Sequence, residues 1–228
     1  MCAFHPWDIT LDEAIQLQRK LGSLVVMVNP ESETASLKCS LIAGVDTVES
    51  SDGTAIYGGV VIWDREKEVV VEQSSARTSA LFPYIPGLLA FRELPAIIRA
   101  LEGLERTPHA VICDGHGLAH PRRFGLACHL GVLLNISSIG CAKNLLTGNC
   151  DQPGHERGEA SPIIDGNEII GVALRTQRGV KPVYVSIGNR VSLEEAVSIV
   201  LTCTVKYRLP EPIRMAHRLV TELRRGES

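Results

Sequence analysis

Two periodicities of apolar residues divide the first half of the chain into a helix and a set of strands. Residues 11–25 carry apolar side chains at helical spacing, interrupted once by Gln18, so a first helix is predicted there. Its apolar face is formed by Leu11, Ala14, Ile15, Leu21 and Val25. Thr10, followed three residues later by Glu13, predicts a capping box at the start of this helix, and Gly22 is a candidate end point.

Three strand-forming runs follow this helix. A polar connector covers Pro30–Ser36 and leads into a strand predicted over Leu37–Val48. Ile56–Trp63 and Glu68–Ala76 are rich in residues that favour strands, and the polar residues 64–67 separate them at the length of a hairpin loop. The sheet is therefore predicted to begin as an antiparallel meander.

A strand–helix–strand unit is predicted in the middle of the chain. It is preceded by a helix over Leu88–Leu104, in which Pro95 lies near the first turns or causes a kink. Ala110–Cys113 indicates a short buried strand, Arg123–Leu134 a helix and Ile136–Cys141 the next strand. Such a unit crosses over right-handed and extends the sheet in parallel.

The last third predicts a hairpin and two helices. Ile163–Leu174 and Pro182–Ile187 are assigned to the hairpin, Ser192–Cys203 to a helix capped by Ser192, and a final helix follows Pro212. The whole order predicts an α/β fold, a mixed sheet flanked by helices, that resembles the ribonuclease H-like fold. We expect a single domain over residues 1–228, with the first helix and its connector in residues 1–36.

Composition narrows the class of protein. A chain of 228 residues, 45% of them hydrophobic, fits one domain with a full core. No apolar run approaches the roughly 20 residues of a membrane span and no charged leader precedes an apolar segment, so we expect a cytoplasmic monomer that has no membrane contact. Seven cysteines without a CxxC pair, with Cys113, Cys128 and Cys203 in apolar segments, indicate reduced core thiols and argue against a zinc site.

The net charge of −3 excludes a protein coated in positive charge, but not a local basic face. Basic side chains after residue 120 are candidates for contacting a phosphate backbone, and a scatter of solvated charges is the alternative. They are Arg122, Arg123, Lys143, Arg175, Arg178, Lys181, Arg190, Lys206 and Arg208.

Acidic and imidazole side chains mark the predicted chemistry. Asp46 and Asp114 each follow an apolar run, so neighbouring strand ends would bring two carboxylates within reach of one cation. Glu93 projects from the middle helix and His217 from the last one. Hard oxygen ligands favour Mg²⁺, and the histidine is compatible with Mn²⁺ as a substitute. Such a set predicts phosphodiester hydrolysis. Each residue alone has an ordinary interpretation as a turn residue or a surface charge.

Two further segments add candidate contacts around this centre. The glycines of Asp114-Gly115-His116-Gly117 permit close backbone approach of a ligand, although a simple turn uses the same residues. His120, Arg122 and Arg123 directly follow, where they could contact a base edge and phosphates. Lys143 follows a strand and could steady a phosphate.

A proline-bracketed aromatic forms the most specific short element. In Pro83-Tyr84-Ile85-Pro86 two prolines hold Tyr84 and Ile85 rigid, so this pair could insert into a duplex and fill the gap left by an unstacked base. A buried turn with Tyr84 packed on the core is the alternative interpretation.

The neighbours of these motifs resemble a known family. The stretches are Phe82-Pro83-Tyr84-Ile85-Pro86-Gly87-Leu88-Leu89-Ala90-Phe91-Arg92-Glu93, Cys113-Asp114-Gly115-His116-Gly117-Leu118-Ala119-His120-Pro121-Arg122-Arg123, Gly140-Cys141-Ala142-Lys143 and Tyr207-Arg208-Leu209-Pro210-Glu211-Pro212. Their order is similar to that of endonuclease V, a repair nuclease for deaminated DNA. The resemblance spans residues 41–219.

This resemblance implies magnesium-dependent cleavage of inosine-containing DNA at the second phosphodiester 3′ to the lesion, leaving 3′-hydroxyl and 5′-phosphate ends. It assigns Asp46, Glu93, Asp114 and His217 to the metal site and Lys143 to catalysis. Arg122 and Lys143 are the predicted phosphate contacts, and Pro83–Pro86 matches a strand-separating wedge. The implied pocket for a flipped hypoxanthine is lined by Gly87, Leu89, Gly115, His120, Gly125, Gly140 and Ala142.

Two residues depart from the family pattern. Glu49 stands where an aromatic residue is usual and would add a carboxylate near the metal site, and Asn189 stands where a histidine is usual.

Two alternatives to a DNA endonuclease stay open. One is a preference for inosine-containing RNA, because a base pocket does not report on the sugar. The other is a lesion-binding protein that has lost catalysis.

Overall fold

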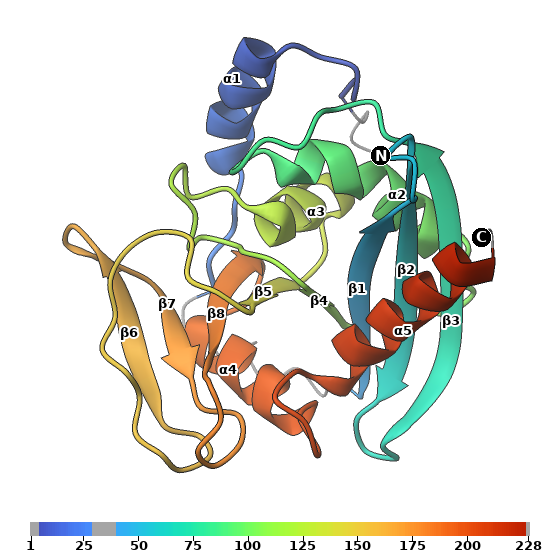
Figure 1. Ribbon diagram of the computed structural model, residues 1–228. Coiled ribbons are helices and arrows are strands. Elements are labelled where there is room, and N and C mark those ends of the chain that lie inside the picture. Colours follow the sequence, from blue (N-terminus) through green and yellow to red (C-terminus); the bar gives the residue numbers. More distant parts are fainter. Residues whose placement is uncertain (1–4, 29–39, 227–228) are drawn as a thin grey trace.

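The computed structural model describes residues 5–28 and 40–226, which form a single-domain α/β structure around one eight-stranded mixed sheet (Figure 1). The strand order is β3-β2-β1-β4-β5-β8-β7-β6. The strands are β1 (Leu41–Glu49), β2 (Ala55–Asp64), β3 (Val69–Ser79), β4 (Ala110–Cys113), β5 (Ser138–Ala142), β6 (Ala160–Asp165), β7 (Glu168–Leu174) and β8 (Val183–Asn189). The helices are α1 (Leu11–Gly22), α2 (Leu89–Glu102), α3 (Leu126–Leu134), α4 (Leu193–Thr202) and α5 (Glu211–Gly226).

The first five strands confirm the predicted ribonuclease H-like arrangement. β1 pairs antiparallel with β2, and β2 with β3, which is the predicted meander. β4 pairs in parallel with β1, and β5 in parallel with β4, with α3 between them in sequence. The expected strand over Leu37–Val48 is described from Leu41 onward, and the connector Pro30–Ser36 lies outside the described residues.

The predicted hairpin in the last third is confirmed in its pairing, because β7 pairs antiparallel with β8, but the extent of its first strand is wrong. The run Ile163–Leu174 is not one strand but two, because a turn with Gly166 at φ +64° reverses the chain between β6 and β7. β8 then pairs antiparallel with both β7 and β5, so it joins this outer β-ribbon to the central sheet. The stretch Asp165-Gly166-Asn167-Glu168 between the two strands is polar and contains an Asp-Gly turn signal, which the prediction of one continuous run overlooked.

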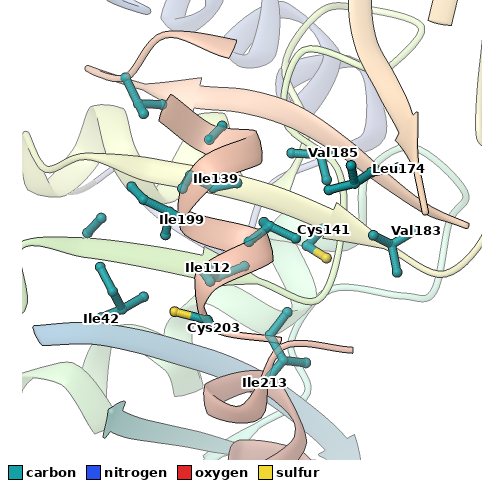
Figure 2. Packing of buried hydrophobic residues seen from close by; sticks show 14 of the residues in the cluster. Ile42, Ile112, Ile139, Cys141, Leu174, Val183, Val185, Ile199, Cys203 and Ile213 are labelled. Carbon is teal, nitrogen blue, oxygen red and sulfur yellow. The ribbon is translucent and has the colours of Figure 1, made fainter. Parts of the chain in front are cut away.

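Helices cover both faces of the sheet because successive side chains in a strand point to opposite sides. Ile42, Ile112 and Ile139 pack against α4 and α5, together with Ile199 and Ile213 of those helices (Figure 2). The neighbouring positions in the strands pack on the other face against α2 and α3, in a core that includes Ala43, Val45, Val111, Leu94, Ile97 and Leu130. The strands therefore contribute to two cores at once.

Local signals set most helix limits. The predicted capping boxes of Thr10 with Glu13 and of Ser192 with Glu195 are both present. α1 ends at Gly22, and Pro95 lies inside α2. α3 begins at Leu126 rather than at Arg123, because Arg123 has φ +54° and cannot continue a right-handed helix.

Two other expectations concern the core and the membrane. Cys113, Cys128 and Cys203 are buried free thiols, as predicted. Within residues 5–28 and 40–226, no helix combines the length and the apolar character needed to cross a membrane.

The last helix docks directly on the central strand. A Cβ atom added to Gly44 of β1 would lie 2.1 Å from the carbonyl carbon of Pro212 at the start of α5. No side chain fits at that distance, so the absence of a side chain at Gly44 lets α5 lie against β1 (Figure 1). This contact places His217 of α5 over β1.

Replacing Gly44 by alanine should therefore displace α5. We expect Gly44→Ala to lower the free energy of unfolding by about 2–3 kcal/mol, the cost of overpacking a rigid contact. Urea unfolding followed by circular dichroism measures this change. Gly226→Ala, at the end of α5, is the matched control, because an added Cβ at Gly226 meets no atom within 4 Å. Equal stability of the two variants would contradict the proposed backbone contact.

Candidate functional site

Three acidic side chains meet where β1, β4 and α2 come together. β1 and β4 are paired in parallel with Val45 opposite Cys113, so the next residues, Asp46 and Asp114, lie side by side. Glu93 reaches the same place from α2, where its carboxyl group interacts electrostatically with both aspartates. The fold thus brings together the carboxylates that the sequence placed on separate elements.

Burial and mutual repulsion disfavour the charged form of these acids. Burial, followed by the charge of Asp114, raises the pKa of Asp46 above its ordinary range. The pKa of Glu93 rises to about 8, chiefly through burial; a hydrogen bond with Thr47 opposes this rise, and the charges of Asp46 and Asp114 add to it. Three carboxylates in this environment require a compensating positive charge.

Two basic side chains contact these acids, and one of them, Lys143, supplies positive charge. Lys143, which directly follows β5, forms a close ion pair with Asp114. Burial would lower the pKa of Lys143, but its hydrogen bond and ion pair with Asp114 raise it, so the ammonium stays charged. Nδ1 of His217 lies 2.6 Å from Oδ2 of Asp46, and the His217 side chain is 59% exposed. All five predicted catalytic residues therefore lie around one centre.

The chemistry of these donors fits a hard divalent cation, because buried carboxylate oxygens are the ligands that Mg²⁺ and Mn²⁺ prefer. Asp46, Glu93 and Asp114 are the side chains that could hold it, with His217 beside them. No group of three or more acidic, histidine or cysteine side chains in the described residues is already arranged to hold a metal ion. Lys143 and His217 each engage one carboxylate oxygen, Oδ2 of Asp114 and Oδ2 of Asp46 respectively.

A pocket of about 160 Å³ opens beside the acidic centre. Five of the seven residues predicted to contact a base line it: Gly87, Leu89, Gly115, His120 and Gly125. Tyr84, Ile85 and Pro86 of the predicted wedge line it as well. Gly115 directly follows Asp114, so the pocket and the acidic centre share one loop.

The other two predicted pocket residues do not line this pocket. Ala142 is buried at the end of β5. Gly140 lies behind the loop, since a Cβ added there would be 2.4 Å from the backbone nitrogen of Gly117. Gly140 therefore lets the loop that bears Asp114 and Gly115 pack against β5.

The wedge segment is only partly exposed. The Tyr84 side chain projects from the surface and is 68% exposed. Ile85 is half-buried and packs against the cluster of Phe82, Leu88 and Phe91. Tyr84 alone is thus free to insert between bases, while Ile85 anchors the segment.

One backbone carbonyl ties the wedge to the rest of the pocket. The Gly87 oxygen accepts hydrogen bonds from Gln18 (3.0 Å) and Arg122 (2.7 Å), and Nε2 of His120 lies 2.9 Å from it. Nε of Arg122 also donates to Oε1 of Gln18 at 2.5 Å. Arg122 therefore supports the pocket wall in this structure, and its contact with a phosphate stays a prediction.

Sequence reasoning missed several pocket residues: Gln18, Ala90, His116, Leu126 and Leu146. For Gln18 a signal was present, because it interrupts the apolar face of α1 and yet is only 1% exposed. A buried amide needs partners, and Gly87 and Phe124 provide them. The other residues carry no comparable signal.

Both histidines of the pocket are neutral at physiological pH. Burial lowers the pKa of His116 and of His120 to about 4; in His120 the neighbouring Arg122 contributes further. Neutral imidazoles leave the pocket without charge and suit it to an uncharged heterocycle rather than to an anion.

The basic residues after position 120 do not form one free face. Arg123 pairs with Asp165 and Glu168 at 2.9 Å each, and Arg178 with Glu156 at 3.1 Å. The guanidinium of Arg175 donates to three backbone carbonyls, those of Pro153, Gly154 and Val180. The charges of Arg123, Arg175 and Arg178 are thus used within the fold, and phosphate contacts of Arg122 and Lys143 stay predictions.

Comparison with known proteins agrees with this geometry. The sequence model of the endonuclease V family matches residues 22–218. An endonuclease V of Trichormus variabilis is 46% identical over 217 residues, covering 95% of this chain and 96% of that protein. The chain belongs to the endonuclease V family.

Solved structures of the family share the fold. Endonuclease V of Streptomyces avermitilis superposes with a TM-score of 0.90 at 40% identity, covering 97% of this chain and 96% of that one. A variant endonuclease V of Ciona intestinalis, in complex with a 23mer DNA containing an inosine followed by a ribo-adenosine, superposes with a TM-score of 0.85 at 28% identity, covering 96% and 100%. The chain is therefore a nuclease of the endonuclease V family.

The two departures from the family pattern have structural partners. Glu49 forms an ion pair with Arg92 at 2.8 Å, so its carboxylate is neutralised away from Asp46. Asn189 is buried; its amide donates to the carbonyls of Gly131 and Ile136, and its oxygen accepts from the backbone of Val26. Asn189 therefore has a structural role that joins α3, β8 and the chain after α1.

The raised pKa of Glu93 predicts a specific dependence of stability on pH. The folded protein holds a proton on Glu93 up to about pH 8, whereas the unfolded chain releases it near its ordinary value of 4.5. The folded state thus binds more protons between these values, and stability falls as pH rises through this range.

In metal-free buffer we expect Glu93→Gln to match the parent protein at pH 5 and to exceed it in free energy of unfolding at pH 8.5. Urea unfolding at intervals from pH 5 to pH 9 measures the difference. Glu222→Gln, at an exposed position of α5, controls for loss of one negative charge. A difference that does not change with pH would show that Glu93 is ionised throughout the range.

Proposed function

We propose that this nuclease uses Mg²⁺ to hydrolyse inosine-containing DNA at the second phosphodiester 3′ to the lesion, leaving 3′-hydroxyl and 5′-phosphate ends. The observation that carries the proposal is the shared loop: Asp114 belongs to the acidic centre and the next residue, Gly115, lines the pocket. A base held in the pocket would therefore keep its own strand at a short, fixed offset from the carboxylates.

Asp46, Glu93 and Asp114 would hold the magnesium ion, with His217 beside Asp46. The ion, when bound, neutralises charge on the phosphate and acidifies water. A nearby cation would lower the pKa of Glu93 from its raised value, so that Glu93, like the two aspartates, would be ionised. Lys143, released from Asp114, would then place its ammonium on a phosphate oxygen of the strand.

The pocket favours a flipped, uncharged base. Its walls combine backbone of Gly87, Gly115 and Gly125 with the neutral imidazoles of His116 and His120. The N–H groups of Gly115 and Gly125 already donate to the carbonyls of Cys113 and Gly117, so the N–H of Gly87 is the glycine donor that could bond O6 of hypoxanthine, an acceptor that adenine lacks. Tyr84, exposed at the rim, would occupy the space that the flipped base leaves in the duplex.

The proposal predicts a cut one nucleotide past inosine that depends on both magnesium and Asp114. Two 5′-labelled oligonucleotides of the same sequence, one DNA and one RNA, each with a single inosine, are incubated with excess protein. We expect cleavage of the DNA, and a loss of at least about a hundredfold in rate for Asp114→Asn, because a buried ligand of the cation is removed.

Asp151→Asn, at an exposed position, is the control and should cleave normally. Cleavage of the RNA alone would replace DNA by RNA as the substrate. The Ciona complex motivates this arm, because its DNA carries a ribo-adenosine after the inosine. Undiminished cleavage by Asp114→Asn, or cleavage without magnesium, would refute the proposed metal site.

A second prediction tests the wedge. Tyr84→Ala should slow single-turnover cleavage of inosine in a duplex about tenfold, because the stacking of an aromatic ring in the vacated space is lost. Cleavage of the same inosine in a single strand should change less than about twofold, since no gap has to be filled. Leu81→Ala is the control, because Leu81 is also exposed and lies two residues before Pro83 but does not line the pocket. Equal effects of Tyr84→Ala on both substrates would exclude a wedge.

A further inference from the structure

The segment between α4 and α5 makes one contact with the acidic centre that no step above uses. Arg208 lies in this segment and is half-buried. Its Nη2 atom donates to the carbonyl oxygen of Lys143 at 2.6 Å and to that of Pro182 at 2.7 Å. One guanidinium nitrogen therefore joins two points of the chain that are distant in sequence.

These two carbonyls lie just outside the sheet. Pairing between β5 and β8 ends at Ala142 opposite Tyr184, so Lys143 follows the last paired residue of β5 and Pro182 precedes β8. The ladder no longer holds the backbone at Lys143. Arg208 replaces the missing strand contact and fixes the point from which the Lys143 side chain departs.

Arg208 is itself held in place. Its carbonyl oxygen accepts a hydrogen bond from Oγ1 of Thr176 at 2.7 Å. The guanidinium carbon of Arg214 lies 3.4 Å from the ring centroid of Tyr207, the residue before Arg208. Arg214 belongs to α5, the helix that also carries His217. The segment is thus anchored on both sides of Arg208.

We propose that Arg208 is a positioning residue that holds Lys143 in register with Asp114 and with the phosphate to be cut. The inference rests on the proposed function, because it concerns how that site is ordered. The Lys143 side chain is long and 42% exposed, so its backbone anchor limits where the ammonium can lie. Arginine suits this task because its planar fork directs two N–H groups at two acceptors, whereas a lysine ammonium at the same place has no fixed direction.

The test compares Arg208→Met and Arg208→Lys with the parent chain. Single-turnover cleavage of the inosine substrate should be about tenfold slower in Arg208→Met and about fivefold slower in Arg208→Lys, which retains the charge. Affinity for the substrate, measured by fluorescence anisotropy without metal, should change less than twofold. Hydrogen exchange of residues 141–144 should be faster in both variants, a readout that does not depend on activity.

A double substitution separates positioning from a general structural role. In a Lys143→Met background the ammonium is absent, so adding Arg208→Met should slow cleavage less than twofold further. A further tenfold loss would show that Arg208 acts independently of Lys143 and would overturn the proposal. Cleavage by both Arg208 variants at the parent rate would overturn it as well. Should Arg208→Met fail to fold, as judged by its thermal transition, Arg208→Lys decides.

Arg157→Met is the matched control. Arg157 also donates to two backbone carbonyls, those of Thr176 and Leu201, at 2.7 and 2.8 Å. It is linked to Arg208 only through Thr176, whose hydroxyl donates to the Arg208 carbonyl, and neither of its acceptors belongs to Lys143. It should cleave at the parent rate. An equal loss of rate in Arg157→Met would mean that Arg208 has only a general structural role, and it would overturn the proposal. Absence of cleavage by the parent chain would instead count against the proposed function and not against this contact.

Discussion

The burial of carboxyl groups next to one another is the constraint on which the site depends. Parallel pairing of β1 with β4 places Asp46 and Asp114 side by side, and α2 adds Glu93. The resulting repulsion is unfavourable for folding, and the ion pair of Lys143 with Asp114 only partly offsets it. A site that is destabilised without a cation is well suited to bind one, because the binding energy includes relief of this repulsion.

The architecture explains how side chains from both faces of the sheet reach that centre. Neighbouring strand residues point to opposite faces, so Asp46 meets His217 of α5 on one side, while Thr47 interacts with Glu93 of α2 on the other. The close approach of α5 at Gly44 and the two separate cores keep these helices in register with β1. Precision at the centre is therefore a property of the whole sheet and its two helical layers.

Recognition and chemistry are mechanically linked through two loops. The loop at Asp114 and Gly115 belongs to both the acidic centre and the pocket. The carbonyl of Gly87, directly after Pro83–Pro86, is a hydrogen-bond acceptor for Gln18 of α1 and for His120 and Arg122, which follow that loop. These hydrogen bonds join the segment that carries Tyr84 to the wall of the pocket.

Local features were readable from the sequence because their causes are local. Capping boxes at Thr10 and Ser192, the antiparallel meander and the acidic residues after apolar runs each depend on a few neighbouring residues. In the last third, the run Ile163–Leu174 was assigned to one arm of a hairpin although Asp165-Gly166 is a turn signal, and the pairing of β6 with β7 shows that the chain reverses there.

The sequence by itself determined the fold class, the family and the residue types of the acidic centre, because strand periodicity and ordered motifs lie along the chain. Only the tertiary structure decided which side chains touch: that Gln18 and Arg122 support the pocket, that Gly140 lies behind it, that Glu49 is neutralised by Arg92, and that Arg208 holds the backbone of Lys143. These contacts join residues far apart in sequence, and their existence depends on distances that are set when the two helical layers close on the sheet.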